Sequence, residues 1–242
     1  MKTIYLISLI LVLGTCTKPV ETPEPCIDGD GNLYPTIQIG RQLWMQENLR
    51  TTKFNNGEPI KKETDSSIWC NPQLPKKPLY CWTYNDPVRY SQPYGALYNG
   101  MVVIGQLNGG KNVCPAGWHV PTTNDWLELT RTLGGIYDAG GKLKETGFVH
   151  WAKPNSGATN SSGFTAVSNI RKTDHDYYQP ILGVQAMLWT STLNGPIREG
   201  YFPQVNVFML IYDKLEGNIG LSFYSIEGLP VRCICDVKLP VK

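Results

Sequence analysis

Cysteines carry the most distinctive potential chemistry in this sequence. The chain has 242 residues and seven cysteines, and the surroundings of Cys16 differ from those of the other six. An apolar run from Ile4 to Leu13 follows Met1-Lys2 and leads to Cys16 through Gly14-Thr15. The run is too short to cross a bilayer as a helix, which needs about 20 residues. Its length is that of the apolar region of a secretory signal peptide, so we expect residues 1–15 to be a cleaved export signal.

The spacing around Cys16 extends this prediction to a lipid anchor. A leucine three residues before a cysteine resembles a bacterial lipobox, in which the cysteine is acylated and becomes the mature N-terminus. Residues 16–25 contain three prolines and two glutamates and suit an extended tether. We therefore expect an outer-membrane lipoprotein, held to the membrane through Cys16 without a spanning segment. The alternative is an ordinary signal peptide with a chance cysteine near its end.

The six remaining cysteines are expected to form disulfides. An even number of cysteines in an exported domain favours disulfides over free thiols. Cys233 and Cys235 lie two residues apart on one face of a strand-like segment, so each should reach a different partner. Several pairings fit six cysteines, and the set that we prefer is Cys70–Cys81, Cys114–Cys233 and Cys26–Cys235. A zinc site is the alternative, but no C-x-x-C pair exists, so we expect neither a metal nor another cofactor.

The three histidines give no clear catalytic signal. His119 lies in the run GWHVP, which has the character of scaffold, and His150 stands apart from the other two. His175 lies between Asp174 and Asp176, where a solvated loop is favoured over a metal site. No G-x-S-x-G, H-E-x-x-H or phosphate-binding glycine loop is present. We therefore expect a non-catalytic protein.

Composition narrows the class of partner. The 22 basic and 20 acidic residues nearly balance, and no run of Lys or Arg exceeds two residues, so nucleic-acid binding is not expected. Aromatic side chains in loops suit stacking on a glycan or docking to a surface protein. The aromatic candidates near loops are Trp69, Trp82, Trp151, Tyr177, Tyr178 and Trp189. The tryptophans assigned to the core are Trp44, Trp118, Trp126 and Trp189.

The pattern of elements predicts one loop-rich α+β domain over residues 26–242, with few short helices and twisted antiparallel strands. Residues 26–49 are typical of a hairpin, and the turn at 28–32 lacks the glutamate of a calcium loop because Ile39 occupies its place. The clearest helix is 123–133, where apolar residues recur at helical spacing. The remaining predictions are short helices at 94–104 and 139–145, strands at 186–190 and 203–211, and a last strand ending near 237.

Several segments together resemble the Fibrobacter succinogenes major paralogous domain of bacterial surface lipoproteins. The matching segments, in chain order, are DGNLYPTIQIGRQLWMQENLRTTKFNNGEPI (30–60), YGALYN (94–99), VCPAGWHVPTTNDWLEL (113–129), GGKLKETG (140–147), HWAKPNSGATNSSGFTA (150–166), LWTST (188–192) and VRCICD (231–236). Gly100 departs from the family pattern, which has an aromatic residue after the Tyr-Asn of YGALYN.

The resemblance implies a fold similar to C-type lectin-like domains and to formylglycine-generating enzymes. It implies the pair Cys114–Cys233 and is compatible with Cys26–Cys235. Calcium-dependent sugar binding is not supported, because Gln92-Pro93 is followed by Tyr94. The resemblance favours a binding or adhesion function. A relative of the formylglycine-generating enzymes, with Cys233 and Cys235 as its reactive pair, and a structural envelope component are the alternatives.

Overall fold

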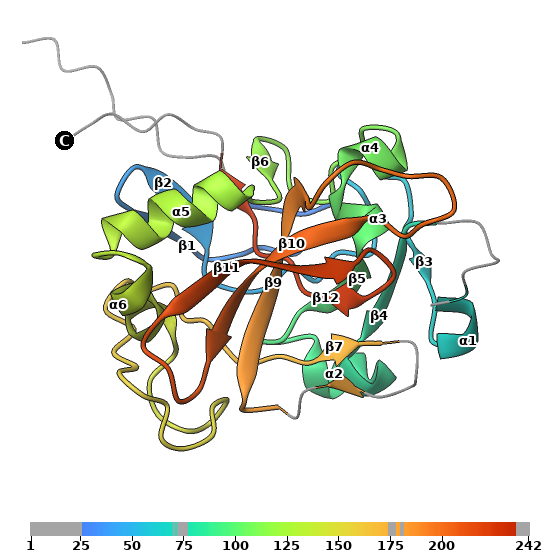
Figure 1. Cartoon of the computed structure of the whole chain (residues 1–242). Coiled ribbons are helices and arrows are strands. Elements are labelled where there is room, and N and C mark those ends of the chain that lie inside the picture. Colours follow the sequence, from blue (N-terminus) through green and yellow to red (C-terminus); the bar gives the residue numbers. More distant parts are fainter. Residues whose placement is uncertain (1–25, 70, 72–76, 174–177, 180–181, 236–242) are drawn as a thin grey trace, which may run out of the picture.

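Three β-sheets and a few short helices form the fold (Figure 1). The structure is a computed structural model and describes residues 26–69, 71, 77–173, 178–179 and 182–235. Every strand pair is antiparallel except β3 with β4. The predicted α+β class with few short helices is confirmed. No helix in the described part of the chain is both long enough and apolar enough to span a membrane.

The first sheet joins the two ends of the domain. Its order is β1-β2-β13-β6, and β1 with β2 forms the predicted hairpin around Gly40. Strand β13 lies between β2 and β6, with Ile234 opposite both Trp44 and His119. The beginning and end of the domain therefore share one sheet. Its strands are β1 (Thr36–Ile39), β2 (Gln42–Met45), β6 (Trp118–His119) and β13 (Ile234–Cys235).

The second sheet contains the longest strands, in the order β11-β10-β9. Strand β10 alternates between buried and half-buried residues, except at a bulge between Val207 and Phe208. This alternation is the pattern of a sheet with one face against a core. The strands are β9 (Gln185–Leu193), β10 (Gln204–Ile211) and β11 (Gly217–Tyr224), and they include the two predicted strands of this region.

The third sheet corrects the helix predicted over 94–104. Residues 96–99 form strand β5, which pairs with β4 and β12, and only the following residues 100–103 are helical. Pairing on both sides and complete burial outweigh the local preference. The sheet comprises β3 (Lys61–Lys62), β4 (Leu79–Trp82), β5 (Ala96–Asn99), β12 (Gly228–Leu229), β7 (Arg171–Lys172) and β8 (Tyr178–Gln179), in that order.

Gly100 departs from the family pattern for a packing reason. Gly100 is buried at the start of α3 and does not lie in a surface loop. Its backbone N–H donates to the Ser225 carbonyl oxygen at 2.7 Å, and an added Cβ would lie 2.6 Å from the Ser225 Cα. The close approach of these two backbones excludes an aromatic side chain at this position.

The helix predicted at 123–133 is confirmed as α5. Thr122 caps it, and the Thr122 and Asp125 side chains each accept a hydrogen bond from the other's backbone N–H. The next helix, α6, begins at Ile136, three residues earlier than predicted, directly after the Gly134-Gly135 turn. The helices are α1 (Ser66–Trp69), α2 (Pro87–Tyr90), α3 (Gly100–Val103), α4 (Gly105–Asn108), α5 (Thr123–Thr132) and α6 (Ile136–Leu143), with a 3-10 turn at Thr83–Asn85.

Two large groups of buried side chains fill the interior. The first, here the disulfide cluster, surrounds Cys114 and Cys233 and includes Trp118 and Trp189. The second, here the aromatic cluster, surrounds Trp126 and includes Trp44, Phe164 and Phe208. A smaller group forms around Trp69 and Ile170. The four tryptophans assigned to the core from sequence are all at most 2% exposed, which confirms that prediction.

Candidate ligand-binding site

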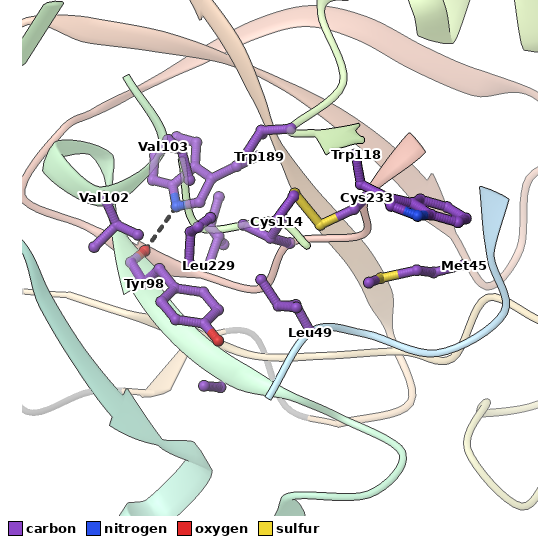
Figure 2. Close-up of a cluster of buried hydrophobic side chains, with 14 of the residues drawn as sticks. Met45, Leu49, Tyr98, Val102, Val103, Cys114, Trp118, Trp189, Leu229 and Cys233 are labelled. Carbon is purple, nitrogen blue, oxygen red and sulfur yellow. Dashed lines mark hydrogen bonds between the residues drawn. A yellow bond between two sulfur atoms is a disulfide. The ribbon is translucent and has the colours of Figure 1, made fainter. Parts of the chain in front are cut away.

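The described cysteines include the predicted Cys114–Cys233 disulfide, which is confirmed. Cys114 and Cys233 are bonded, with their Cα atoms 5.9 Å apart and a sequence separation of 119. Figure 2 shows this bond packed among Met45, Leu49 and Trp118, while the nearby Trp189 Nε1 donates to the Tyr98 carbonyl oxygen at 2.7 Å. Cys233 is therefore part of the core and is not available as a thiol in this structure.

The other two predicted disulfides are Cys26–Cys235 and Cys70–Cys81. Cys26 is a buried thiol, so the predicted Cys26–Cys235 bond is not formed here. Burial raises the pKa of Cys26 to about 12, and the charges of Cys235 and Asp28 add to this effect. Cys81 is fully buried in β4, but Cys70 lies outside the described residues, so the Cys70–Cys81 pair stays a prediction.

The turn at residues 28–32 is confirmed as a turn. Asp28 accepts hydrogen bonds from the backbone of Asp30 and Asn32, from the Asn32 amide and from the Tyr34 hydroxyl. Asp30 in turn accepts from Thr52. Within the described residues, no group of three or more His, Cys, Asp or Glu is placed to hold a metal ion.

Of the two described histidines, His119 has a structural role and His150 is a candidate ligand-binding residue. His119 Nε2 lies 3.3 Å from an Asp125 oxygen that also accepts from Thr122, so it belongs to the cap of α5. His175 lies outside the described residues. His150 is half-buried, and its Nδ1 lies 2.7 Å from Glu145 Oε2. Glu145 therefore orients the imidazole of His150 through its Nδ1 atom.

The exposed aromatic side chains differ from those predicted. Trp69, Trp82, Trp151 and Trp189 are all at most 8% exposed and belong to the core. Three of these tryptophans lie in regular elements, Trp69 in α1, Trp82 in β4 and Trp189 in β9, and Trp151 alone among the four lies in an irregular segment. Tyr177 and the side chain of Tyr178 lie outside the description. Among the side chains that the structure describes, the exposed aromatic ones are Tyr84, Tyr137, Phe148, Tyr201 and Tyr224.

A hollow of about 260 Å³ lies beside His150. We call it the histidine hollow. Phe148 and Val149 form part of its wall and are 54% and 83% exposed. The Tyr94 ring lies edge-on to the imidazole, with centroids 5.6 Å apart. Tyr90 contacts Tyr94, and Tyr84 contacts Tyr90, at centroid distances of 5.7 Å and 5.3 Å. The remaining wall comes from Trp151, Ala152, Leu182 and Gly183.

Backbone contacts hold the two walls of the histidine hollow together. Ala152 N–H donates to the Gly183 carbonyl oxygen at 2.9 Å. Ser168 Oγ accepts from Gly183 N–H at 2.8 Å and also bonds the His150 carbonyl oxygen. The segment that carries His150 is thereby tied to the start of β9. An apolar, partly exposed rim around one oriented polar group is the arrangement found in small-molecule binding sites.

A buried lysine packs against Trp151, a lining residue of the histidine hollow. Lys144 is fully buried, and its ammonium lies 5.6 Å from the centre of the Trp151 ring. Burial lowers the pKa of Lys144 to about 8, against the opposing influence of Asp213 and Glu216. The Lys144 Nζ donates to four backbone carbonyl oxygens, those of Ser156 at 2.9 Å, Ile211 at 3.1 Å, Tyr212 at 3.4 Å and Lys214 at 2.8 Å.

Comparison with known proteins identifies the family. The model of the Fibrobacter succinogenes major domain matches residues 37–235, which is most of the chain. The chain belongs to this family. No curated protein and no solved structure gives a significant match.

The segments that resemble the Fibrobacter succinogenes major domain divide between core and site. Residues 113–129 supply Cys114, Trp118 and the cap of α5, all of which are structural. Residues 150–166 supply His150 and Trp151 of the histidine hollow. Phe148 and Val149 lie just before that segment, and only their exposure in the structure reveals them as candidates.

Proposed function

We propose that the chain is an envelope-anchored lipoprotein whose Fibrobacter succinogenes major domain binds a glycan in the histidine hollow without catalysing a reaction. The observation that carries this proposal is the hollow itself, with Phe148 and Val149 exposed on its rim and His150 oriented by Glu145. Apolar ring faces stack on the C–H faces of sugars, while an oriented imidazole nitrogen can exchange a hydrogen bond with a hydroxyl group.

A lipid anchor at Cys16 would leave the histidine hollow accessible. The described chain ends at β13, which pairs with β6 beside α5, whereas α2 and the start of β9 lie at the opposite end of the molecule (Figure 1). A tether of residues 16–25 would span at most about 35 Å when extended. A domain held near Cys26 would therefore present the histidine hollow away from the membrane.

A C-type-lectin-like fold is part of the same proposal. The presence of the first and last described strands, β1 and β13, in one sheet supports it, as does the disulfide that links the VRCIC segment to the segment before α5. The enzyme alternative requires Cys233 as a reactive thiol. The bond between Cys114 and Cys233 counts against that role.

The test uses the full chain in detergent micelles and neutral oligosaccharides on an array, followed by calorimetric titration of the best ligand. Phe148→Ala is expected to weaken binding at least about tenfold, which corresponds to about 1.4 kcal/mol. Tyr137→Ala is the matched control, because Tyr137 is 79% exposed and lies outside the hollow. Equal affinity of both variants and the wild type would place any ligand elsewhere. Turnover of the oligosaccharide would favour an enzyme.

The anchor has a separate test. The intact mass of the protein from its native membrane should correspond to a diacylated or triacylated chain that begins at Cys16. An unmodified chain that begins at another residue would contradict lipidation, whatever the outcome of the glycan experiment.

A further inference from the structure

A second hollow lies at the other end of β9. It has a volume of about 340 Å³, within the range of small-ligand sites. It is formed by the loop between β9 and β10 together with the last residue of β11. We call it the arginine hollow, and its principal lining residues are Asn194, Arg198, Tyr201, Pro203, Gln204 and Tyr224.

The frame of the arginine hollow is built from strand pairing. Gln204 lies opposite Tyr224 in the β10–β11 register. Asn194 N–H donates to the Gln204 carbonyl oxygen at 2.8 Å, and Ser225 N–H donates to the Pro203 carbonyl oxygen at 2.8 Å. Both ends of the loop and the base of Tyr224 are therefore held by backbone hydrogen bonds. A site on such a frame needs little ordering when a ligand binds.

The chemistry of the lining is aromatic and cationic. Tyr201 is 71% exposed and Tyr224 is 51% exposed. Among the described residues that line the hollow, Arg198 alone is charged, and Glu199 is not part of the lining. No ion pair of Arg198 occurs within the described part of the chain. Its guanidinium can therefore offer a carboxylate two parallel hydrogen bonds.

We propose that the arginine hollow binds an acidic saccharide, with the sugar carboxylate on Arg198 and the sugar ring against Tyr201 and Tyr224. Two exposed tyrosines suit the flat face of a sugar better than an extended peptide, because they combine an apolar ring with a hydroxyl group. The positive charge selects uronic acids over neutral sugars.

This site is independent of the histidine hollow. Strand β9 has nine residues and separates Gly183 at one hollow from Asn194 at the other. At about 3.3 Å per residue the strand spans about 30 Å, longer than a monosaccharide or disaccharide. Figure 1 shows β9 running through the molecule between these two ends. A failure at one hollow therefore leaves the other proposal standing.

The test titrates the full chain with trigalacturonate and with its methyl ester, which keeps the rings and removes the charges. We expect binding of the acid, weakened by added salt, and at least about tenfold weaker binding of the ester. Arg198→Gln should weaken binding of the acid by the same factor, and Arg198→Lys should restore part of it. Arg41→Gln serves as the control, because Arg41 is exposed in the β1–β2 turn.

Three outcomes would overturn the proposal. The first is equal binding of acid and ester, and the second is equal affinity of Arg198→Gln and the wild type. The third is a loss of binding in Phe148→Ala, since the acid would then occupy the histidine hollow. Complete absence of binding counts against the proposal as well, provided that near-ultraviolet circular dichroism shows a folded chain.

Discussion

The two large core clusters are stabilised by different interactions. The disulfide cluster is joined covalently by Cys114–Cys233. The aromatic cluster is built on stacked rings, with Trp126 and Phe208 centroids 4.1 Å apart. Two buried cations flank the aromatic cluster, Lys144 near Trp151 and Arg232 over Phe164.

The two buried cations bond to an irregular segment beside the aromatic cluster. Much of the segment 144–170 has no regular strand or helix, so its backbone carbonyls lack ladder partners. Lys144 satisfies the Ser156 carbonyl, and Arg232 satisfies the Phe164 carbonyl at 2.6 Å. Arg232 also donates twice to Asn48 Oδ1, and burial lowers its pKa to about 9. Long cationic side chains thus replace strand pairing where the chain is irregular.

The largest expected effect is on the disulfide cluster. The double variant Cys114→Ser/Cys233→Ser should lower the free energy of unfolding by up to about 5 kcal/mol. The reason is that the bond joins two residues with a sequence separation of 119 and so closes a long loop. Urea unfolding with and without reductant measures this loss. Reduction of the wild type should reproduce it, and a stability indifferent to reductant would remove the distinction between the two clusters.

The stability of the aromatic cluster should depend on the Lys144 side chain. Lys144→Met leaves up to four carbonyl oxygens without their donor, and we expect a loss of about 3 kcal/mol in the free energy of unfolding. Lys142→Met is the matched control, since Lys142 Nζ donates to the Leu133 carbonyl alone, and about 1 kcal/mol is expected. Similar losses for both variants would show that the four carbonyl contacts of Lys144 contribute no more to the free energy of unfolding than the single contact of Lys142.

The pH dependence sharpens the same comparison. The folded chain is expected to release the Lys144 proton at a pKa of about 8, whereas the unfolded chain keeps it to the ordinary value of 10.5. Between these values the unfolded state binds more protons, so the Lys144 contribution to stability rises with pH. The stability of the wild type minus that of Lys144→Met should therefore increase from pH 8 to pH 10. A flat difference would mean that the carbonyls restore the ordinary pKa.

The smallest effect concerns the thiol of Cys26. Because Cys26 is buried and its pKa is raised to about 12, iodoacetamide at pH 8 should leave it unmodified in the folded protein. Unfolding without reductant should then make it reactive, as peptide mass spectrometry can show. Modification that requires reductant would instead establish the Cys26–Cys235 bond predicted from sequence.

Local sequence was sufficient for the features that depend on neighbours along the chain. The hairpin around Gly40, the turn at 28–32 and helix α5 follow from turn residues, a capping threonine and helical spacing. The family segments were readable from the order of motifs along the chain, and the Cys114–Cys233 pair followed from the resemblance to the family.

Only the tertiary structure decided which side chains are buried. Residues 96–99 became a strand because β4 and β12 pair on either side, and Trp151 became core because Lys144 and Ala166 lie against it. Burial depends on residues distant in sequence, so exposure of Phe148, Tyr201 and Tyr224 could not be predicted from their types alone. For the same physical reason neither hollow could be predicted from the sequence, since each is assembled from segments that meet only when the chain is folded.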